Sequence, residues 1–307
     1  MKTAIISDIH GNYPALLAVI EDARRNWVDR FIFAGDYIFD LPYPNEVTEV
    51  LRGLDNEVVI QGNKEGYLDR LSEENQQDWD LEQFGAVYQT FRELSPENIT
   101  YLAGLEKETF VSLPHGGRVY VTHYIKELIG DKKKTECSSA MFRKEMEREP
   151  FSHADFLKSA DCFLKEEHSI EVLGKINAEV IVFGHSHLQW HGYCGDKLII
   201  NPGSCGQPLD FNTDAAYTIL EDSESGFSVT EKRVSYDIEE TISYSKDSEI
   251  CKAGRVWCEL VFKAIRTGRD VFSSFFEIAY EVAAQRDEND RLFSNEIWNI
   301  AAERYGL

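Results

Sequence analysis

The segment Ser7-Asp8-Ile9-His10-Gly11-Asn12 constrains this chain more than any other. It follows an apolar run over residues 3–6 that predicts a buried parallel strand. It precedes a helix expected to begin near Tyr13, with Asn12 as its N-cap. Asp8 and His10 therefore stand on the turn that leaves the carboxyl end of a strand, where sites form in open α/β sheets. An Asp-x-His pair there can bind one metal ion through a carboxylate and an imidazole.

The same arrangement of a strand followed by polar side chains recurs along the chain. Apolar runs over residues 30–34, 57–60, 118–122 and 178–183 predict further strands. Each polar residue alone has an ordinary interpretation, such as a turn residue or a structural histidine. The polar residues that follow the strands are Asp8, His10, Asp36, Asn63, His123, His185 and His187.

All seven of these side chains are oxygen or imidazole donors. Together they can supply two metal ions bridged by one carboxylate, an arrangement that clamps the attacking and leaving oxygens of phosphoryl transfer and keeps a water ionised near neutral pH. Carboxylate, amide and imidazole ligands without a thiolate suit Mn, Fe, Ni or Zn. The sequence therefore indicates a dinuclear metal centre.

Composition excludes several other classes of protein. The chain has 307 residues, of which 43% are hydrophobic, and a formal net charge of −22. That charge repels phosphate backbones, so we expect no extended nucleic-acid surface. The six cysteines form no Cys-x-x-Cys pair, and neither a signal peptide nor a membrane span is recognisable. We expect a cytoplasmic protein with reduced thiols.

The remaining segments predict a mixed α/β region followed by helices. Residues 76–104 and 126–177 have mainly helical patterns, and residues 197–200 predict a strand that runs into the small-residue loop 201–206. Residues 215–220 and 226–234 predict a two-stranded meander that completes a second sheet. From residue 236 onward the period is helical. Aromatic residues of that region must pack on the core, cover the site or join subunits into a homo-oligomer, and packing on the core is the simplest alternative: Phe272, Phe275, Phe276 and Trp298.

The order of these motifs resembles the calcineurin-like metallophosphoesterase superfamily, and in particular its small bacterial and archaeal phosphodiesterase branch. The motifs are Asp8-x-His10, Gly35-Asp36, Gly62-Asn63, His123 and Gly184-His185-x-His187. The resemblance covers roughly residues 1–236. It implies an α/β fold, a four-layer α/β/β/α sandwich of two mixed sheets, over residues 1–236, with an all-helical appendage over residues 237–307.

The resemblance also implies roles for the seven donor residues. One metal ion would be held by Asp8, His10, Asp36 and His187, and the other by Asp36, Asn63, His123 and His185, with Asp36 as the bridge. The expected activity is hydrolysis of a small phosphodiester or phosphomonoester by a metal-bridged hydroxide. Asn12 is an expected substrate contact.

One position departs from the family pattern. The family usually places a histidine after Gly-Asn, where it contacts the phosphate or protonates the leaving group, whereas this chain has Lys64 followed by Glu65. Lysine offers a positive charge and three donors, but its ordinary pKa near 10.4 makes it a poor acid at neutral pH. We expect Lys64 to bind substrate and act electrostatically. Two nearby metal ions would lower its pKa, and Glu65 would raise it.

Two alternatives to this function remain open at this point. One is a protein or nucleotide phosphatase with the same fold. The other is a metal-binding scaffold that has lost catalysis, as the retromer scaffold subunit has within this superfamily. Loss of ligands is the feature that would favour the scaffold, and every expected ligand is present in this chain.

Overall fold

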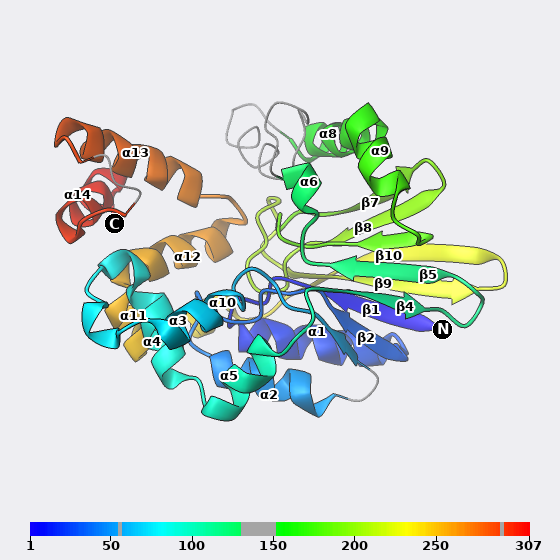
Figure 1. Ribbon diagram of the computed structural model, residues 1–307, viewed down its shortest axis with the longest axis horizontal. Coiled ribbons are helices and arrows are strands. Elements are labelled where there is room, and N and C mark those ends of the chain that lie inside the picture. Colours follow the sequence, from blue (N-terminus) through cyan, green and yellow to red (C-terminus); the bar gives the residue numbers. More distant parts are fainter. Residues whose placement is uncertain (55–56, 130–151, 289–291) are drawn as a thin grey trace.

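Two five-stranded mixed sheets form the centre of the molecule in the computed structural model, which describes residues 1–54, 57–129, 152–288 and 292–307 (Figure 1). The first sheet has the order β10-β9-β1-β2-β3 and the second the order β4-β5-β6-β8-β7. The strands of the first sheet are β1 (Lys2–Ile6), β2 (Arg30–Phe33), β3 (Glu57–Val59), β9 (Ala215–Ser223) and β10 (Gly226–Val234). Those of the second are β4 (Glu108–Ser112), β5 (Arg118–Thr122), β6 (Val180–Val182), β7 (Gln189–Cys194) and β8 (Lys197–Pro202).

The sheets pack face to face because alternate residues of their strands are apolar on the inner side. Ile5 and Ile32 of the first sheet belong to the same buried cluster as Val121 and Val182 of the second. The neighbouring residues of β1, Ala4 and Ile6, belong instead to the cluster on the outer face. This alternation is the period of two that a strand buried on both faces requires.

Helices cover both outer faces and complete the four-layer α/β/β/α sandwich (Figure 1). On the first sheet lie α1 (Tyr13–Arg25) and α2 (Pro44–Gly53), and on the second lie α8 (His153–Lys165) and α9 (Glu167–Gly174). The other helices that the structure describes before the C-terminal region are α3 (Tyr67–Glu73), α4 (Gly85–Glu93), α5 (Pro96–Ala103), α6 (Lys126–Ile129) and the short 3₁₀ turns η1 (Gln76–Asp78) and η2 (Glu82–Phe84). None of the described helices combines the length and apolar character needed to cross a membrane.

The structure corrects two sequence-based expectations. The meander of β9 and β10 belongs to the first sheet and not to the second, because β9 pairs antiparallel with β1 on the side opposite β2. Strand β7 has no counterpart in the prediction, since its sequence mixes polar residues with Gly192 and shows no clear alternation. Of the helical pattern expected over residues 126–177, residues 130–151 lie outside the described part of the chain.

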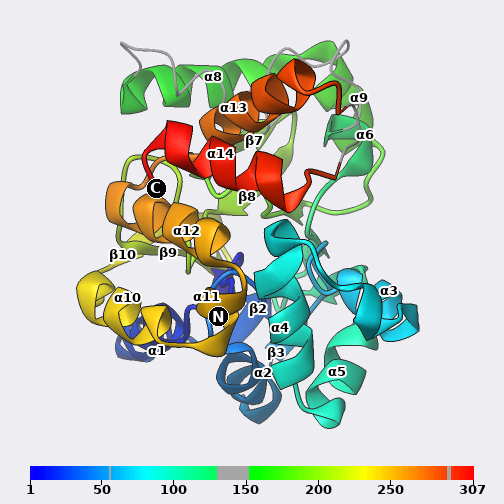
Figure 2. The same ribbon diagram turned by 90° about the vertical axis from the view of Figure 1, so that its left-hand side faces the viewer.

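The C-terminal region is helical, as the period predicts. It contains α10 (Ile238–Lys246), α11 (Glu249–Ala253), α12 (Arg255–Thr267), α13 (Phe272–Gln285) and α14 (Asn295–Tyr305). These helices lie at the end of the sandwich toward which β1 runs from the amino terminus (Figures 1 and 2). They pack on the rest of the chain: Phe275 and Trp298 share a buried cluster with Trp190, and Val261 shares one with Leu41. A domain boundary at residue 236 remains a prediction.

Replacing Phe275 by alanine is expected to lower the free energy of unfolding by about 3–5 kcal/mol, because a fully buried ring is removed and leaves a cavity. Tyr244, an aromatic residue of α10 whose side chain is 64% exposed, provides the control, and its alanine variant should change stability by less than about 0.5 kcal/mol. Urea denaturation of both variants measures the difference. Equal effects would contradict the packing of α13 on the core.

Candidate metal centre

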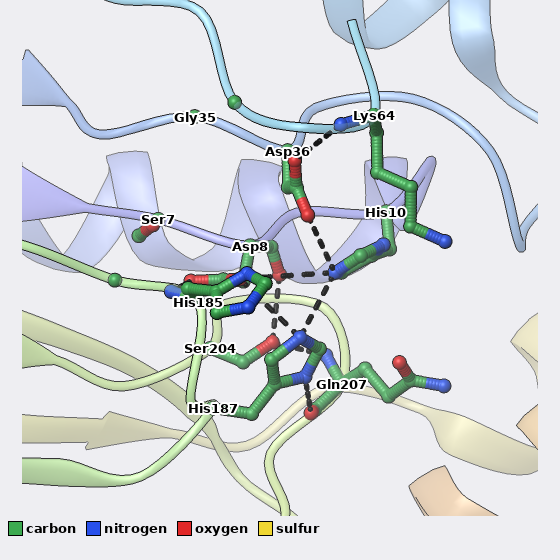
Figure 3. Close-up of polar contacts among 12 residues, drawn as sticks. Ser7, Asp8, His10, Gly35, Asp36, Lys64, His185, His187, Ser204 and Gln207 are labelled. Carbon is green, nitrogen blue, oxygen red and sulfur yellow. Dashed lines mark hydrogen bonds and ion pairs between the residues drawn. The ribbon is translucent and has the colours of Figure 1, made fainter. Parts of the chain in front are cut away.

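Two groups of potential ligand atoms meet at the carboxyl ends of the strands. Asp8, His10 and His187 form the first group, and in it one ligand atom from each residue lies within 4.8 Å of the others (Figure 3). Asp36, His123 and His185 form the second group by the same measure.

Asn63 and Asp36 extend and link the two groups. Oδ1 of Asn63 lies 3.1 Å from Nε2 of His123 and so joins the second group. Oδ2 of Asp36 lies 3.4 Å from Nε2 of His123 and 3.9 Å from Nε2 of His10. The structure therefore brings all seven sequence-predicted donors together, with Asp36 between the two groups. Their individual roles as ligands remain predictions.

The backbone around these donors is unusual. Asp8, His10, Asp36, His185 and His187 all have φ between 52° and 66°, in the left-handed region that L-residues seldom occupy. Such conformations persist only where the surrounding structure imposes them, and they gather at functional sites. Here they turn the side chains away from the ordinary strand or helix direction and toward one shared point.

Hydrogen bonds fix which nitrogen of two imidazoles is available to a metal. Nδ1 of His123 lies 2.7 Å from the carbonyl oxygen of Ala34, and Nδ1 of His187 lies 2.7 Å from that of Gln207. A carbonyl can only accept, so each Nδ1 carries the proton. When the ring is neutral, its Nε2 therefore presents a lone pair to the centre, as in metal-bound histidines generally.

Asp8 provides an independent test of whether a cation fits. Its carboxylate is fully buried, and among the described residues Oδ1 accepts no hydrogen bond. That oxygen instead lies 3.3 Å from Nε2 of His187. A buried carboxylate oxygen that accepts no hydrogen bond is costly unless a cation compensates it. The donors present thus fit a divalent ion.

Backbone packing requires glycine beside these residues. A Cβ on Gly62 would lie 2.2 Å from Oδ1 of Asp36, and one on Gly206 would lie 1.8 Å from the carbonyl oxygen of Ile9. Gly206 belongs to the loop 201–206, and Ser204 of that loop donates to the carbonyl oxygen of Asp8 at 2.7 Å. The loop therefore braces the turn that carries Asp8, which agrees with the close backbone approach expected from its small residues.

Glu65 has a role that the sequence did not indicate. Its fully buried carboxylate accepts hydrogen bonds from the backbone N–H groups of Asp36, Tyr37 and Gly62 at 2.8–3.0 Å. It therefore holds the two turns that carry Asp36 and Asn63 in one arrangement. An effect of Glu65 on the pKa of Lys64 remains a prediction. Asp40 is the main carboxylate that raises the pKa of Lys64.

Asp40 is a residue that the sequence analysis missed. Its buried carboxylate lies 2.7 Å from Nδ1 of His10 and 3.2 Å from Nζ of Lys64, and it accepts a hydrogen bond from Nε1 of Trp257 at 2.7 Å. Burial lowers the pKa of Lys64, but Asp40 outweighs that effect and raises the pKa above its ordinary value. Trp257 belongs to α12, so the C-terminal helices reach the site. In the sequence, the position of Asp40 four residues after Asp36 was the only signal that could have pointed to it.

The expected substrate contact of Asn12 is not supported. Its side chain is fully buried, Oδ1 accepts from the N–H of Ala15 at the start of α1, and the amide nitrogen donates to the carbonyl oxygen of Gly206 and to the hydroxyl of Tyr236. All of its hydrogen-bonding capacity except one lone pair is used within the protein. The N-cap role predicted for Asn12 is confirmed.

The imidazoles of the metal-free site hold protons firmly. Burial alone would lower the pKa of His10, but Asp40 and Asp8 together outweigh it and raise the pKa to about 9. Burial likewise disfavours protonated His123, yet Asp36 raises its pKa to about 10. Because a metal ion binds only the neutral ring, it must displace these protons.

Metal uptake is therefore expected to strengthen as pH rises from 6 to 9, by up to about tenfold per pH unit for each proton displaced. Calorimetric titration with Zn²⁺ in buffers of different ionisation enthalpy measures both the affinity and the number of protons released. Uptake that is independent of pH and releases no proton would contradict the protonation of His10 and His123.

Comparison with known proteins agrees with this geometry. The family model described as calcineurin-like phosphoesterase matches residues 1–189, a range that contains all seven donors. The chain belongs to the calcineurin-like phosphoesterase family. It is 27% identical over 237 residues to MJ0912, an uncharacterised protein of Methanocaldococcus jannaschii, covering 76% of this chain and 88% of that protein.

Two solved structures share the fold. A metallophosphoesterase from Sphaerobacter thermophilus has a TM-score of 0.61 and 22% identity, with 87% of this chain and 99% of that chain covered. The hypothetical protein PH1004 from Pyrococcus horikoshii has a TM-score of 0.59 and 16% identity, with 85% of this chain and 97% of that chain covered. Membership in the family supports metal-dependent phosphoester hydrolysis in general and leaves the substrate open.

Proposed function

We propose that this calcineurin-like phosphoesterase hydrolyses a small phosphate ester at a centre of two divalent ions. The observation that carries the proposal is the convergence of three imidazole Nε2 atoms, from His10, His123 and His187, on the buried carboxylates of Asp8 and Asp36. Two bound ions would supply Lewis acidity toward the phosphoryl group and lower the pKa of an attacking water.

Residues of the chain would hold the two ions and orient the phosphoryl group. Asp36 lies between the two ligand groups and would bridge the ions. Lys64, whose side chain is 16% exposed, ends beside His10 (Figure 3) and keeps a positive charge through its contact with Asp40. That charge would bind a phosphoryl oxygen and stabilise the negative charge that develops on it in the transition state.

The test combines metal analysis with an ester assay. Purified protein is stripped with a chelator and reloaded with Mn²⁺, Zn²⁺, Ni²⁺ or Fe²⁺. Bound metal is counted by mass spectrometry, and hydrolysis of bis-p-nitrophenyl phosphate and p-nitrophenyl phosphate is followed. We expect the reloaded protein to bind two ions per chain. We also expect the reloaded protein to hydrolyse the esters and the stripped protein not to do so. Two bound ions without hydrolysis of any ester in a wider panel would favour the scaffold, and failure to bind metal would overturn the site.

A further inference from the structure

A cavity of about 780 Å³ opens beside the second ligand group, and Asn63 and His123 form part of its wall. This volume is typical of a site for a small organic ligand. Beyond the metal ligands, it runs along β4, β5, α6 and α9. The residues of its wall that matter for recognition are Tyr67, Lys107, Tyr120, Tyr124, Lys126 and Lys175.

The charge of this wall differs from that of the whole chain. Acidic residues outnumber basic ones by 54 to 32 in the sequence, yet the described wall contains three lysines and one carboxylate, Glu108. Lys175 pairs with Glu171 at 2.8 Å, and Glu108 accepts a hydrogen bond from the hydroxyl of Tyr120. No carboxylate of the described residues pairs with Lys107 or Lys126. With respect to the residues that the structure describes, these two cations remain available to a ligand.

Aromatic rings connect the metal centre with the lysines. The ring of Tyr124 lies edge-on to that of His123, with centroids 6.1 Å apart, and 5.5 Å from that of His185. Tyr67, Tyr120 and Ile176 continue the wall from there. A flat organic group attached to a phosphate at the metal centre would therefore contact aromatic and apolar surface in this cavity, and the two lysines of the wall could bind an anionic group on it.

We propose that this cavity is a specificity site for phosphate esters whose organic part carries a second anionic group, which Lys107 and Lys126 bind. The proposal rests on the phosphoesterase function proposed above. It narrows the substrate class to doubly anionic esters with a planar organic part, of which a nucleoside bisphosphate ester is a representative. A phosphate or a carboxylate would satisfy the same two lysines.

A matched pair of chromogenic substrates tests the specificity. Thymidine 5′-(p-nitrophenyl phosphate) and the same ester with an added 3′-phosphate release the same leaving group and differ in the second anion alone. We expect the 3′-phosphorylated ester to have a kcat/KM about tenfold higher, mainly through a lower KM. The preference should shrink with added NaCl, because partly exposed charges are screened. Equal kcat/KM values for the two esters would overturn the proposal.

Variants assign the preference to the lysines. Lys107→Ala combined with Lys126→Ala should remove the preference, so that the two thymidine esters have equal kcat/KM. Lys165→Ala provides the control for loss of a surface lysine, since Lys165 is exposed on α8 and paired with Asp161. A preference that survives the double variant would show that these lysines do not bind the second anion.

Binding measurements separate this proposal from the proposed function. Calorimetry of the metal-loaded protein compares thymidine 3′,5′-bisphosphate with thymidine 5′-monophosphate, and we expect the bisphosphate to bind about tenfold more tightly in a manner that requires Lys107 and Lys126. If no ester is hydrolysed but this difference is found, the proposed function fails and the anion site stands. If bis-p-nitrophenyl phosphate is hydrolysed and the bisphosphate binds no better, the anion site fails alone.

Discussion

Replacing Asp36 by asparagine is expected to abolish binding of at least one metal ion and to reduce kcat at least a thousandfold, on the order of the loss of a major electrostatic contribution. One oxygen of Asp36 lies between the two ligand groups, 3.4 Å from Nε2 of His123 and 3.9 Å from Nε2 of His10. Asparagine keeps the size of the side chain but removes the charge that lets two dications lie close together.

Metal counting and turnover of bis-p-nitrophenyl phosphate measure this effect, and thermal denaturation checks that the variant is folded. Asp222→Asn is the matched control. Asp222 is also buried, but its carboxylate accepts a hydrogen bond from the backbone N–H of His115, in a turn between strands β4 and β5. The control should keep both ions and normal turnover. An Asp36→Asn protein that did the same would refute the bridging role.

Replacing Lys64 by alanine is expected to slow aryl and alkyl phosphate esters by similar factors, on the order of tenfold to a thousandfold. In the metal-free site Asp40 raises the pKa of Lys64 above its ordinary value, and we expect the amine to keep its proton and act as a charge when the ions are bound. An electrostatic contact stabilises the phosphoryl group to a similar extent whether the leaving group is an aryl or an alkyl alcohol. A general acid would matter far more for an alkoxide than for p-nitrophenolate.

The comparison uses p-nitrophenyl and methyl esters of the same phosphate, with kcat and KM measured separately. Lys64→Arg should retain part of the rate for both esters because the charge is kept. Lys64→His, which restores the usual residue of the family, should favour the alkyl ester selectively. If Lys64→Ala lost alkyl-ester turnover selectively, Lys64 would be the acid, and if neither ester responded it would lie outside the chemistry.

The resemblance carried by the sequence motifs implied the sandwich, and the apolar runs predicted the strands. Because the carboxyl ends of parallel strands lie at one edge of a sheet, the polar residues after each run were expected to gather there, although Asp8 and His187 are 179 positions apart in the chain. These residues follow strands of both sheets, so the packing of one sheet on the other is what brings them together. The helical period after residue 236 predicted the C-terminal helices in the same way.

The tertiary structure alone decided features that depend on contacts between distant segments. The meander of β9 and β10 could pair with either sheet, because its alternation specifies a buried face and not a neighbour. The left-handed conformations of Asp8 and Asp36 are imposed by surrounding packing and have no sequence signal.

The tertiary structure also decided which partner each buried polar side chain contacts. Asn12 could have faced the substrate, yet helix α1 and the loop around Gly206 take up its amide. The partner of Lys64 is Asp40 rather than the adjacent Glu65, because Glu65 is turned toward four backbone N–H groups. Trp257, 217 residues away in the chain, completes the Asp40 contacts only because α12 packs against the loop that carries Asp40 and Leu41. Sequence periodicity identifies which faces are buried, whereas the hydrogen bonds of a buried polar group depend on which segments the fold brings within about 3 Å of it.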